Sequence, residues 1–138
     1  MAAPIIDRGR TGRNVKSKVY AGFDKAIPDG ATIMFPGFAG VGIPRNLTAA
    51  LLDRGARNLT GIANGSGGRD DQIDTGALLR AGQFKKMVLA FTASPHPSNV
   101  TIFDELYQSD RIEAELVPQG TLAEAEITVP PGLSEVQI

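Results

Sequence analysis

Glycines gather in one short stretch, residues 29–44, in a pattern that can hold an anion. The apolar run Thr32–Phe35 comes first, and the loop that follows contains Gly37, Gly40 and Gly42. Pro44 then opens a segment with leucines at helical spacing, so the stretch predicts a strand, a loop and a helix N-terminus. Such a loop directs bare backbone N–H groups and the positive end of a helix dipole to one point. It can therefore hold an anion, or an oxygen that becomes negative during a reaction.

The glycines of this stretch also allow a simpler interpretation. Glycine permits a tight turn between a strand and a helix without any ligand, and the residue types alone leave both interpretations open. The dinucleotide fingerprint G-x-G-x-x-G is absent, because the spacing here is G-x-x-G-x-G. The nucleotide phosphate loop is absent too, because Ile43 follows Gly42 where that motif has a lysine.

A second glycine-rich segment, Asn64–Gly68, follows the predicted strand Asn58–Ala63. The carboxyl ends of parallel strands meet at one edge of a sheet, and ligands of open α/β sheets bind at that edge. The sequence therefore predicts that residues 36–44 and 64–69 lie on one rim of the sheet.

The sequence contains no convincing nucleophile with a base beside it. His96 lies between two prolines, which is typical of a surface loop. Ser66 is one glycine short of the G-x-S-x-G nucleophile elbow and is interpreted as a loop serine. The acids Asp70, Asp71 and Asp74 are interpreted as solvated or helix-capping residues. No spacing of His, Asp and Glu indicates a metal site.

Apolar periodicity divides the chain into the elements that must position these loops. The predicted helices are Ser17–Ile27, Pro44–Arg54, a short helix capped by Thr75 and ended by Gly82, and residues 99–108. The predicted strands are Thr32–Phe35, Asn58–Ala63, Lys86–Phe91 and Ile112–Val117, the last half-exposed near a sheet edge. This alternation predicts an α/β fold: an open, mostly parallel sheet with helices on both faces and right-handed crossovers.

The composition is that of an ordinary globular protein. Apolar residues make up 42% and charged residues 21% of the chain, and the net charge of -1 gives no field that favours nucleic acid. No apolar run reaches the length of a membrane span, so no membrane partner is expected. The absence of cysteine excludes a disulfide framework and fits a cytoplasmic location. Residues 1–16 are basic and irregular, and we interpret them as a flexible leader.

Residues 29–44 also resemble the signature of family I CoA-transferases. The signature has Asp-Gly, two residues, three apolar residues, Gly-Gly-Phe, three residues, Gly, one residue and Pro. This chain matches every fixed position except that Pro36, which has no N–H, replaces the first Gly. Further segments that agree are Lys18–Tyr20, Gly42–Leu47, Leu78–Gly82 and Pro118–Glu124. The resemblance is to the A subunit of succinyl-CoA:3-oxoacid CoA-transferase and its 3-oxoadipate relatives, over about residues 16–124.

The resemblance implies the A subunit of an enzyme that moves CoA between carboxylic acids, such as succinate and a 3-oxo acid. In the family, the acyl-CoA thioester is attacked by a glutamate of the B subunit, which then carries CoA as a glutamyl-CoA thioester. That glutamate precedes an Asn-Gly pair, and the alignment places Ala63 at its position, so this chain is expected to be inactive without a B subunit.

The implied oxyanion and CoA-binding residues are Gly37, Phe38, Ala39, Gly40, Gly42, Asn64 and Gly65. Coenzyme A enters as a substrate, and neither a covalently bound cofactor nor a metal is implied. The expected partners are a B subunit, acyl-CoA and carboxylic acids, in a hetero- or homo-oligomer.

The resemblance ends after Glu124. We therefore expect one CoA-transferase-like α/β domain over residues 17–124, a divergent tail over 125–138, and no counterpart of the C-terminal part of the family fold. Arg45 stands where the family commonly has a glutamate, and it is interpreted as solvated. Two other functions stay open: a catalytically silent binding or scaffold relative of the same fold, and a CoA-ester hydrolase subunit in which water replaces the second carboxylate.

Overall fold

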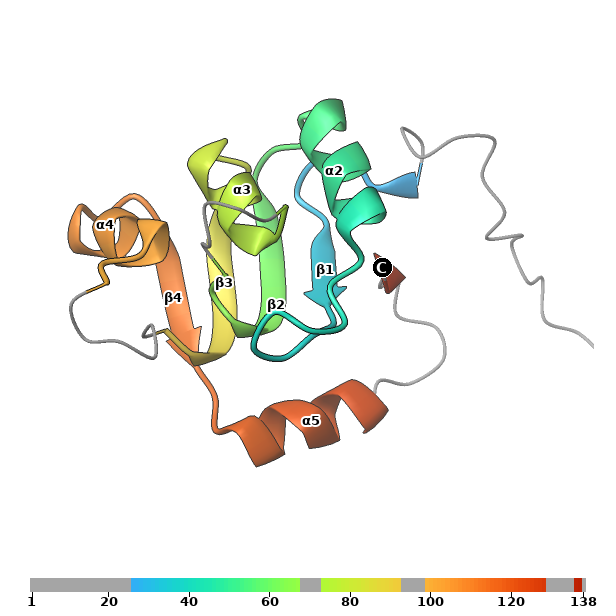
Figure 1. The fold of residues 1–138 in the computed structure, drawn as a ribbon, viewed down its shortest axis with the longest axis vertical. Helices are drawn as coiled ribbons and strands as arrows, with labels where there is room; N and C mark the ends of the chain where they lie inside the picture. Colours follow the sequence, from blue (N-terminus) through green and yellow to red (C-terminus); the bar gives the residue numbers. More distant parts are fainter. Residues whose placement is uncertain (1–25, 68–72, 93–98, 129–135, 138) are drawn as a thin grey trace, which may run out of the picture.

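The computed structural model describes residues 26–67, 73–92, 99–128 and 136–137. These residues form a five-stranded sheet in the order β4-β3-β2-β1-β5, with every neighbouring pair parallel (Figure 1). The strands are β1 (Thr32–Phe35), β2 (Leu59–Gly65), β3 (Phe84–Phe91), β4 (Glu113–Leu116) and β5 (Val136–Gln137). The helices are α2 (Arg45–Arg54), α3 (Thr75–Arg80), α4 (Ile102–Gln108) and α5 (Gln119–Thr128). The α/β fold with a parallel sheet, predicted from the sequence, is confirmed.

Helices α2, α3 and α4 pack on the same face of the sheet. From β1 to β4 each crossover steps to the next strand in one direction, and right-handed crossovers that step in one direction place their helices on one face. Their buried side chains join one core cluster with the strands, which includes Leu51, Leu78 and Phe103 from the helices and Ile33, Ala63 and Leu89 from the sheet. Helix α5 lies apart from these three, at the end of the sheet where the strands finish (Figure 1).

The predicted elements from β1 to β4 agree with the structure except at their ends, whereas α5 and β5 have no counterpart among the predicted elements. The strand predicted at Thr32–Phe35 has the observed bounds, and the predicted edge strand at Ile112–Val117 is β4, the outermost strand beside β3. The prediction that Thr75 caps the third helix is wrong, because the Asp74 carboxylate accepts the Gly76 N–H at 2.7 Å. The short acidic side chain satisfies a free N–H of the first turn better than the following threonine can. The predicted helix Ser17–Ile27 lies almost entirely outside the described residues.

Local sequence signals explain where two helices begin and end. Gly55 ends α2 in the left-handed conformation (φ 69°), and its N–H donates to the carbonyls of Leu51 and Leu52, as the sequence predicts. Helix α4 begins after a reciprocal cap, in which Thr101 Oγ1 accepts from the Asp104 N–H and the Asp104 carboxylate accepts from the Thr101 N–H. This cap moves the start of α4 to Ile102, later than the predicted residue 99.

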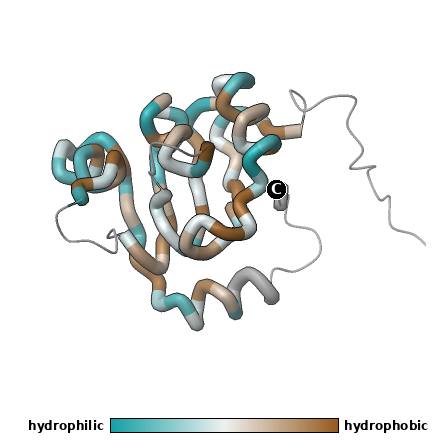
Figure 2. The backbone as a smooth tube through the Cα atoms, in the orientation of Figure 1, coloured by the Kyte–Doolittle hydropathy of each residue, from teal (hydrophilic) through white to brown (hydrophobic). Residues whose placement is uncertain are grey.

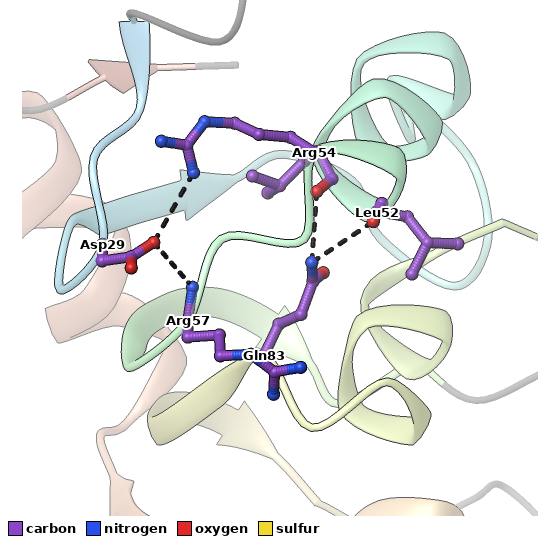
Figure 3. A network of polar contacts seen from close by, with 6 residues as sticks. Asp29, Leu52, Arg54, Arg57 and Gln83 are labelled. Atoms are coloured by element: carbon purple, nitrogen blue, oxygen red, sulfur yellow. Dashed lines mark hydrogen bonds and ion pairs between the residues drawn. The ribbon is translucent and has the colours of Figure 1, made fainter.

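A network of polar contacts connects the segments at the amino-terminal ends of the strands (Figure 3). The Asp29 carboxylate accepts the Arg57 N–H at 3.0 Å and lies 3.6 Å from the Arg54 guanidinium. The buried amide of Gln83 donates to the carbonyls of Leu51 and Leu52 at the carboxyl end of α2. These contacts occupy the end of the sheet opposite the glycine loop, so their role is to hold the scaffold of that loop.

The helices on the sheet contain residues of mixed hydropathy. Helices α2, α3 and α4 each carry hydrophobic and hydrophilic segments, as amphipathic helices packed on a sheet do (Figure 2). At the β3–β4 edge, Lys86 Nζ lies 2.6 Å from a Glu115 carboxylate oxygen, and this hydrogen bond raises the pKa of Lys86 above its ordinary value. None of the described helices has the length and apolar character needed to cross a membrane.

Gly61 in the middle of β2 makes room for two side chains of β3. A Cβ at this position would lie 2.5 Å from Met87 Sδ and 2.8 Å from Phe84 Cε1. We expect Gly61→Ala to lower the free energy of unfolding by about 1–3 kcal/mol, because the core is overpacked. Urea unfolding followed by circular dichroism measures this change. The control is Gly120→Ala in α5, where a Cβ meets nothing within 4 Å; equal midpoints for the two variants would contradict the prediction.

Candidate functional site

The glycine loop contains a tight hairpin turn. The Phe38 N–H donates to the Val41 carbonyl at 2.9 Å, and the Val41 N–H donates to the Phe38 carbonyl at 3.0 Å. The two residues between them both have positive φ, 50° at Ala39 and 86° at Gly40, as in a type I′ turn. Ala39 adopts this conformation although its Cβ disfavours it. The turn is therefore well defined and mildly strained at one position.

This turn decides which backbone N–H groups of the loop are available. The N–H groups of Phe38 and Val41 bond to each other's carbonyls, so neither is free for a ligand. The N–H groups of Ala39, Gly40 and Gly42 make no hydrogen bond to another residue in the described part of the chain. Within the predicted set of loop residues, the geometry thus distinguishes Phe38, whose donor is used, from Ala39, Gly40 and Gly42.

Gly37 has a steric reason to be glycine. Its φ is 119°, and a Cβ would lie 3.0 Å from the Val41 carbonyl oxygen and 3.1 Å from Ile43 Cγ1. The chain folds back on itself here, so Gly37 lies close to Val41 and Ile43 at the far end of the turn. Glycine at this position is a requirement of the turn itself.

The loop leads into α2, whose first turn contains no acidic residue. Pro44 precedes the helix without a side-chain capping hydrogen bond, and its carbonyl accepts from both the N–H and the hydroxyl of Thr48. Arg45 is exposed at the first helical position, as expected from the sequence. The loop and the N-terminus of α2 both lie past the end of β1. The strand β2, which comes next in the chain, lies on one side of β1, and the last strand, β5, lies on the other side, so the strand order reverses at β1. Ligands of open α/β sheets bind at such a switch point.

The second predicted site segment begins within a strand. Asn64 and Gly65 are the last residues of β2, so the strand continues past Ala63, the end predicted from the sequence. Gly65 pairs in register with Phe91 of β3. The Asn64 Oδ1 atom is buried and has no hydrogen-bond partner among the described residues. Both residues therefore lie at the rim where the glycine loop leaves β1.

Ala63, the position aligned with a glutamate nucleophile, faces the helix-covered core. Its side chain is 3% exposed, and it pairs in register with Phe35 on one side and Leu89 on the other. A side chain at this position points away from solvent. The residue therefore serves packing.

The polar residues that follow β2 hold loops together. Ser66 is buried, its hydroxyl donates to the Thr92 carbonyl at 3.3 Å, and its own carbonyl accepts from Thr75 Oγ1 at 2.9 Å. Asp74 caps α3. These contacts agree with the interpretation of Ser66 as a loop serine and of Asp74 as a capping acid. Asp70, Asp71 and His96 lie outside the described residues. Among the residues that the structure describes, no cluster of His, Cys, Asp and Glu could hold a metal ion.

An aromatic side chain that the sequence did not single out also reaches the rim. The rings of Phe38 and Phe91 meet edge to face, with centroids 6.4 Å apart and planes at 72°. Phe38 is 56% and Phe91 47% exposed, unlike the buried aromatic pair Phe35 and Phe84. The signal in the sequence was an aromatic residue at the carboxyl end of a predicted strand, next in the sheet to the glycine-rich segment.

A groove of about 630 Å³ lies elsewhere, at the start of β3 and β4. Its walls carry cations and carboxylates together, among them Lys85, Lys86, Arg111 and Glu113. Because these charges are of both signs and lie at the opposite end of the strands from the glycine loop, the groove is separate from the candidate site.

Comparison with known proteins places this architecture in a family. Residues 21–136 match the family described as coenzyme A transferase. The chain is 46% identical to the A subunit of the 3-oxoadipate CoA-transferase of Pseudomonas putida over 100 residues, which are 72% of this chain and 41% of that protein. It is 39% identical over 100 residues to the A subunit of a probable succinyl-CoA:3-ketoacid coenzyme A transferase of Bacillus subtilis, covering 72% and 39%. It is 37% identical over 117 residues to the human mitochondrial succinyl-CoA:3-ketoacid coenzyme A transferase 2, covering 83% and 21%.

A solved structure shows the same fold. A variant of the decarboxylase AibA/AibB superposes with a TM-score of 0.52 at 21% identity, over 68% of this chain and 36% of that chain. The chain spans about two-fifths of the length of the bacterial relatives named above. The family match covers most of the chain, and the glycine loop that carries the signature has a defined geometry at the sheet rim. The chain belongs to the coenzyme A transferase family.

Proposed function

We propose that this chain supplies the non-nucleophile half of a CoA-transferase active site, as the A subunit of that enzyme. The observation that carries the proposal is the turn at residues 38–41, at the carboxyl edge of the sheet. It leaves the N–H groups of Ala39 and Gly40 without partners among the described residues. Family membership and relatives named as A subunits of CoA-transferases support it. The substrates would be an acyl-CoA and a carboxylic acid, with succinyl-CoA and a 3-oxo acid as the pair that the relatives' names indicate.

The proposed chemistry uses a carboxylate from the partner subunit. That carboxylate attacks the thioester carbonyl, and the carbonyl oxygen becomes an oxyanion before CoA thiolate leaves. Thiolate then attacks the mixed anhydride, which leaves a glutamyl-CoA thioester and releases the first acid. A second acid takes CoA by the same two steps in reverse. Each step passes through an oxyanion, so one donor placed at that oxygen can lower the barrier by about 3 kcal/mol.

The loop is suited to this task by its backbone. The N–H groups of Ala39 and Gly40 are successive donors on a turn whose own hydrogen bonds are already made by Phe38 and Val41. Such donors need no reorganisation during the reaction, which is the basis of oxyanion stabilisation by preorganised groups. Asn64 and Gly65 end the neighbouring strand and complete the proposed contact surface for CoA. We assign the process to the cytoplasm.

The nucleophile is assigned to the partner because the described residues of this chain offer none. Ala63 stands at the aligned position and is buried in the core, so even a carboxylate there would face away from the rim. A hetero-oligomer with a B subunit is therefore part of the proposal. The competing functions are a catalytically silent relative and a CoA-ester hydrolase subunit.

The decisive experiment compares the chain alone with the chain mixed with the B subunit of the Pseudomonas putida enzyme. We expect no transfer of CoA from succinyl-CoA to acetoacetate or 3-oxoadipate by the pure chain, and turnover in the mixture. Robust turnover by the pure chain would contradict the assignment of the nucleophile. Release of free CoA without a second acid would favour the hydrolase, and a stable but inactive complex would favour the silent relative.

A further inference from the structure

The turn at residues 38–41 is joined to the rest of the sheet by a ring contact. Its two hydrogen bonds connect Phe38 and Val41 to each other, and in the described residues no hydrogen bond connects the four residues of the turn to another strand. A contact that does reach from the turn to another strand is the one between the rings of Phe38 and Phe91, at 6.4 Å between centroids. The turn is thus fixed within itself by hydrogen bonds, and the aromatic pair connects it to the end of β3.

This contact crosses the strand that carries the second site segment. Phe38 follows β1, Phe91 ends β3, and β2 lies between these strands with Gly65 opposite Phe91. A Cβ built at Gly65 would meet nothing within 4 Å, so the space above this strand end is open. The edge-to-face pair therefore links the loop that follows β1 to the end of β3, across the width of β2. The interplanar angle of 72° is the geometry in which the ring edge of one aromatic meets the face of the other.

The exposure of the two rings argues that their contact serves position more than packing. Phe38 is 56% and Phe91 47% exposed, so about half of each residue stays in contact with water. A half-exposed aromatic ring adds less to the stability of the sheet than a fully buried one, since burial of apolar area is what stabilises. They do limit the directions that the turn can take.

We infer that Phe91 is a positioning residue that holds the turn at residues 38–41, through the Phe38 ring, over the carboxyl end of β2. This inference rests on the proposed function, because it assigns to Phe91 the placement of the Ala39 and Gly40 N–H groups against the thioester oxygen. Phe91 acts through Phe38 and need not touch the substrate.

The first test measures the position of the turn without any reaction. The full chain contains no tryptophan, so Phe38→Trp introduces a single fluorescent reporter. We expect the anisotropy of its emission to fall, and its quenching by acrylamide to rise, when Phe91→Ala is added. Phe91→Tyr keeps the ring and should leave both unchanged. Tyr107→Ala is the matched control, because it removes a 54% exposed aromatic that stacks on Phe103 in α4. Unchanged anisotropy in the Phe91→Ala background would overturn the inference.

The second test measures turnover in the complex with the B subunit, using succinyl-CoA and 3-oxoadipate. A misplaced donor loop should lower kcat by about ten- to a hundredfold in Phe91→Ala, with KM for succinyl-CoA little changed. Phe91→Tyr should restore kcat, and Tyr107→Ala should keep it. A normal kcat in Phe91→Ala would overturn the positioning role even if the reporter moved. Absence of turnover in the wild-type complex would instead refute the proposed function, while the reporter still decides whether Phe91 holds the turn.

Discussion

Replacing Gly40 by valine is expected to reduce the turnover of the complex by two orders of magnitude or more, while thermal stability changes little. Gly40 has a φ of 86° and lies at the second central position of the turn. A β-branched side chain is strongly disfavoured there, so the turn opens and its two N–H groups lose their shared direction. Loss of one oxyanion donor alone costs about 10²–10³ in kcat. The turn lies outside the core, so unfolding should be nearly unaffected.

The matched control for this prediction is Ala39→Gly. Ala39 has a φ of 50° with a Cβ in place, so glycine relieves strain and keeps the N–H group. We expect turnover close to that of the wild type and a melting temperature equal to or slightly above it. Steady-state kinetics in the complex and scanning calorimetry of the chain measure the two effects. Full activity in Gly40→Val would show that residues 36–44 form only a connection between β1 and α2.

Truncating Leu51 to alanine should lower the free energy of unfolding by about 2–5 kcal/mol, through a lost side chain and the cavity that remains. Leu51 is fully buried and belongs to the core cluster, and together with Thr48 it provides the buried residues of α2. Stabilities of globular proteins are about 5–15 kcal/mol, so this change is a large share of the total. Leu51 lies in α2 and outside the glycine loop, so turnover should fall only in proportion to the fraction of the chain that is folded.

Leu47→Ala provides the comparison on the same helix. Leu47 is 42% exposed, and its truncation should change stability by no more than about 0.5 kcal/mol. The linear dependence of unfolding free energy on urea concentration gives both values, with equal slopes expected. Similar losses for the two leucines would mean that α2 does not pack on the sheet through Leu51.

Most of the fold could be predicted because its signals are local. The run Thr32–Phe35 is apolar and short, and it became β1 with those bounds. The alternation of apolar and acidic residues in Ile112–Val117 identified an edge strand, which β4 is. Element ends were harder to predict, because a cap depends on which side chain reaches a free N–H. Asp74 and Thr75 are neighbours with similar capping preferences, and the backbone conformation selected Asp74.

The candidate site could be predicted only as a set of residues. The glycines at 37, 40 and 42 marked the loop, and the alternation of strands and helices placed it on the rim with Asn64 and Gly65. Glycine spacing does not say which N–H groups remain free. That depended on the hydrogen bonds between Phe38 and Val41, which form only when the chain turns at Ala39 and Gly40.

The sequence by itself determined the α/β class, the order of the elements from β1 to β4 and the glycine loop between β1 and α2, because periodicity and turn chemistry act over a few neighbouring residues. The family signature is likewise contained in one contiguous stretch, residues 29–44. Tertiary structure alone decided that Ala63 faces the core, since the face of a strand depends on what packs against it. It alone brought Phe91 to Phe38, because residues 53 positions apart (91 minus 38) meet only once β1, β2 and β3 lie side by side in the sheet.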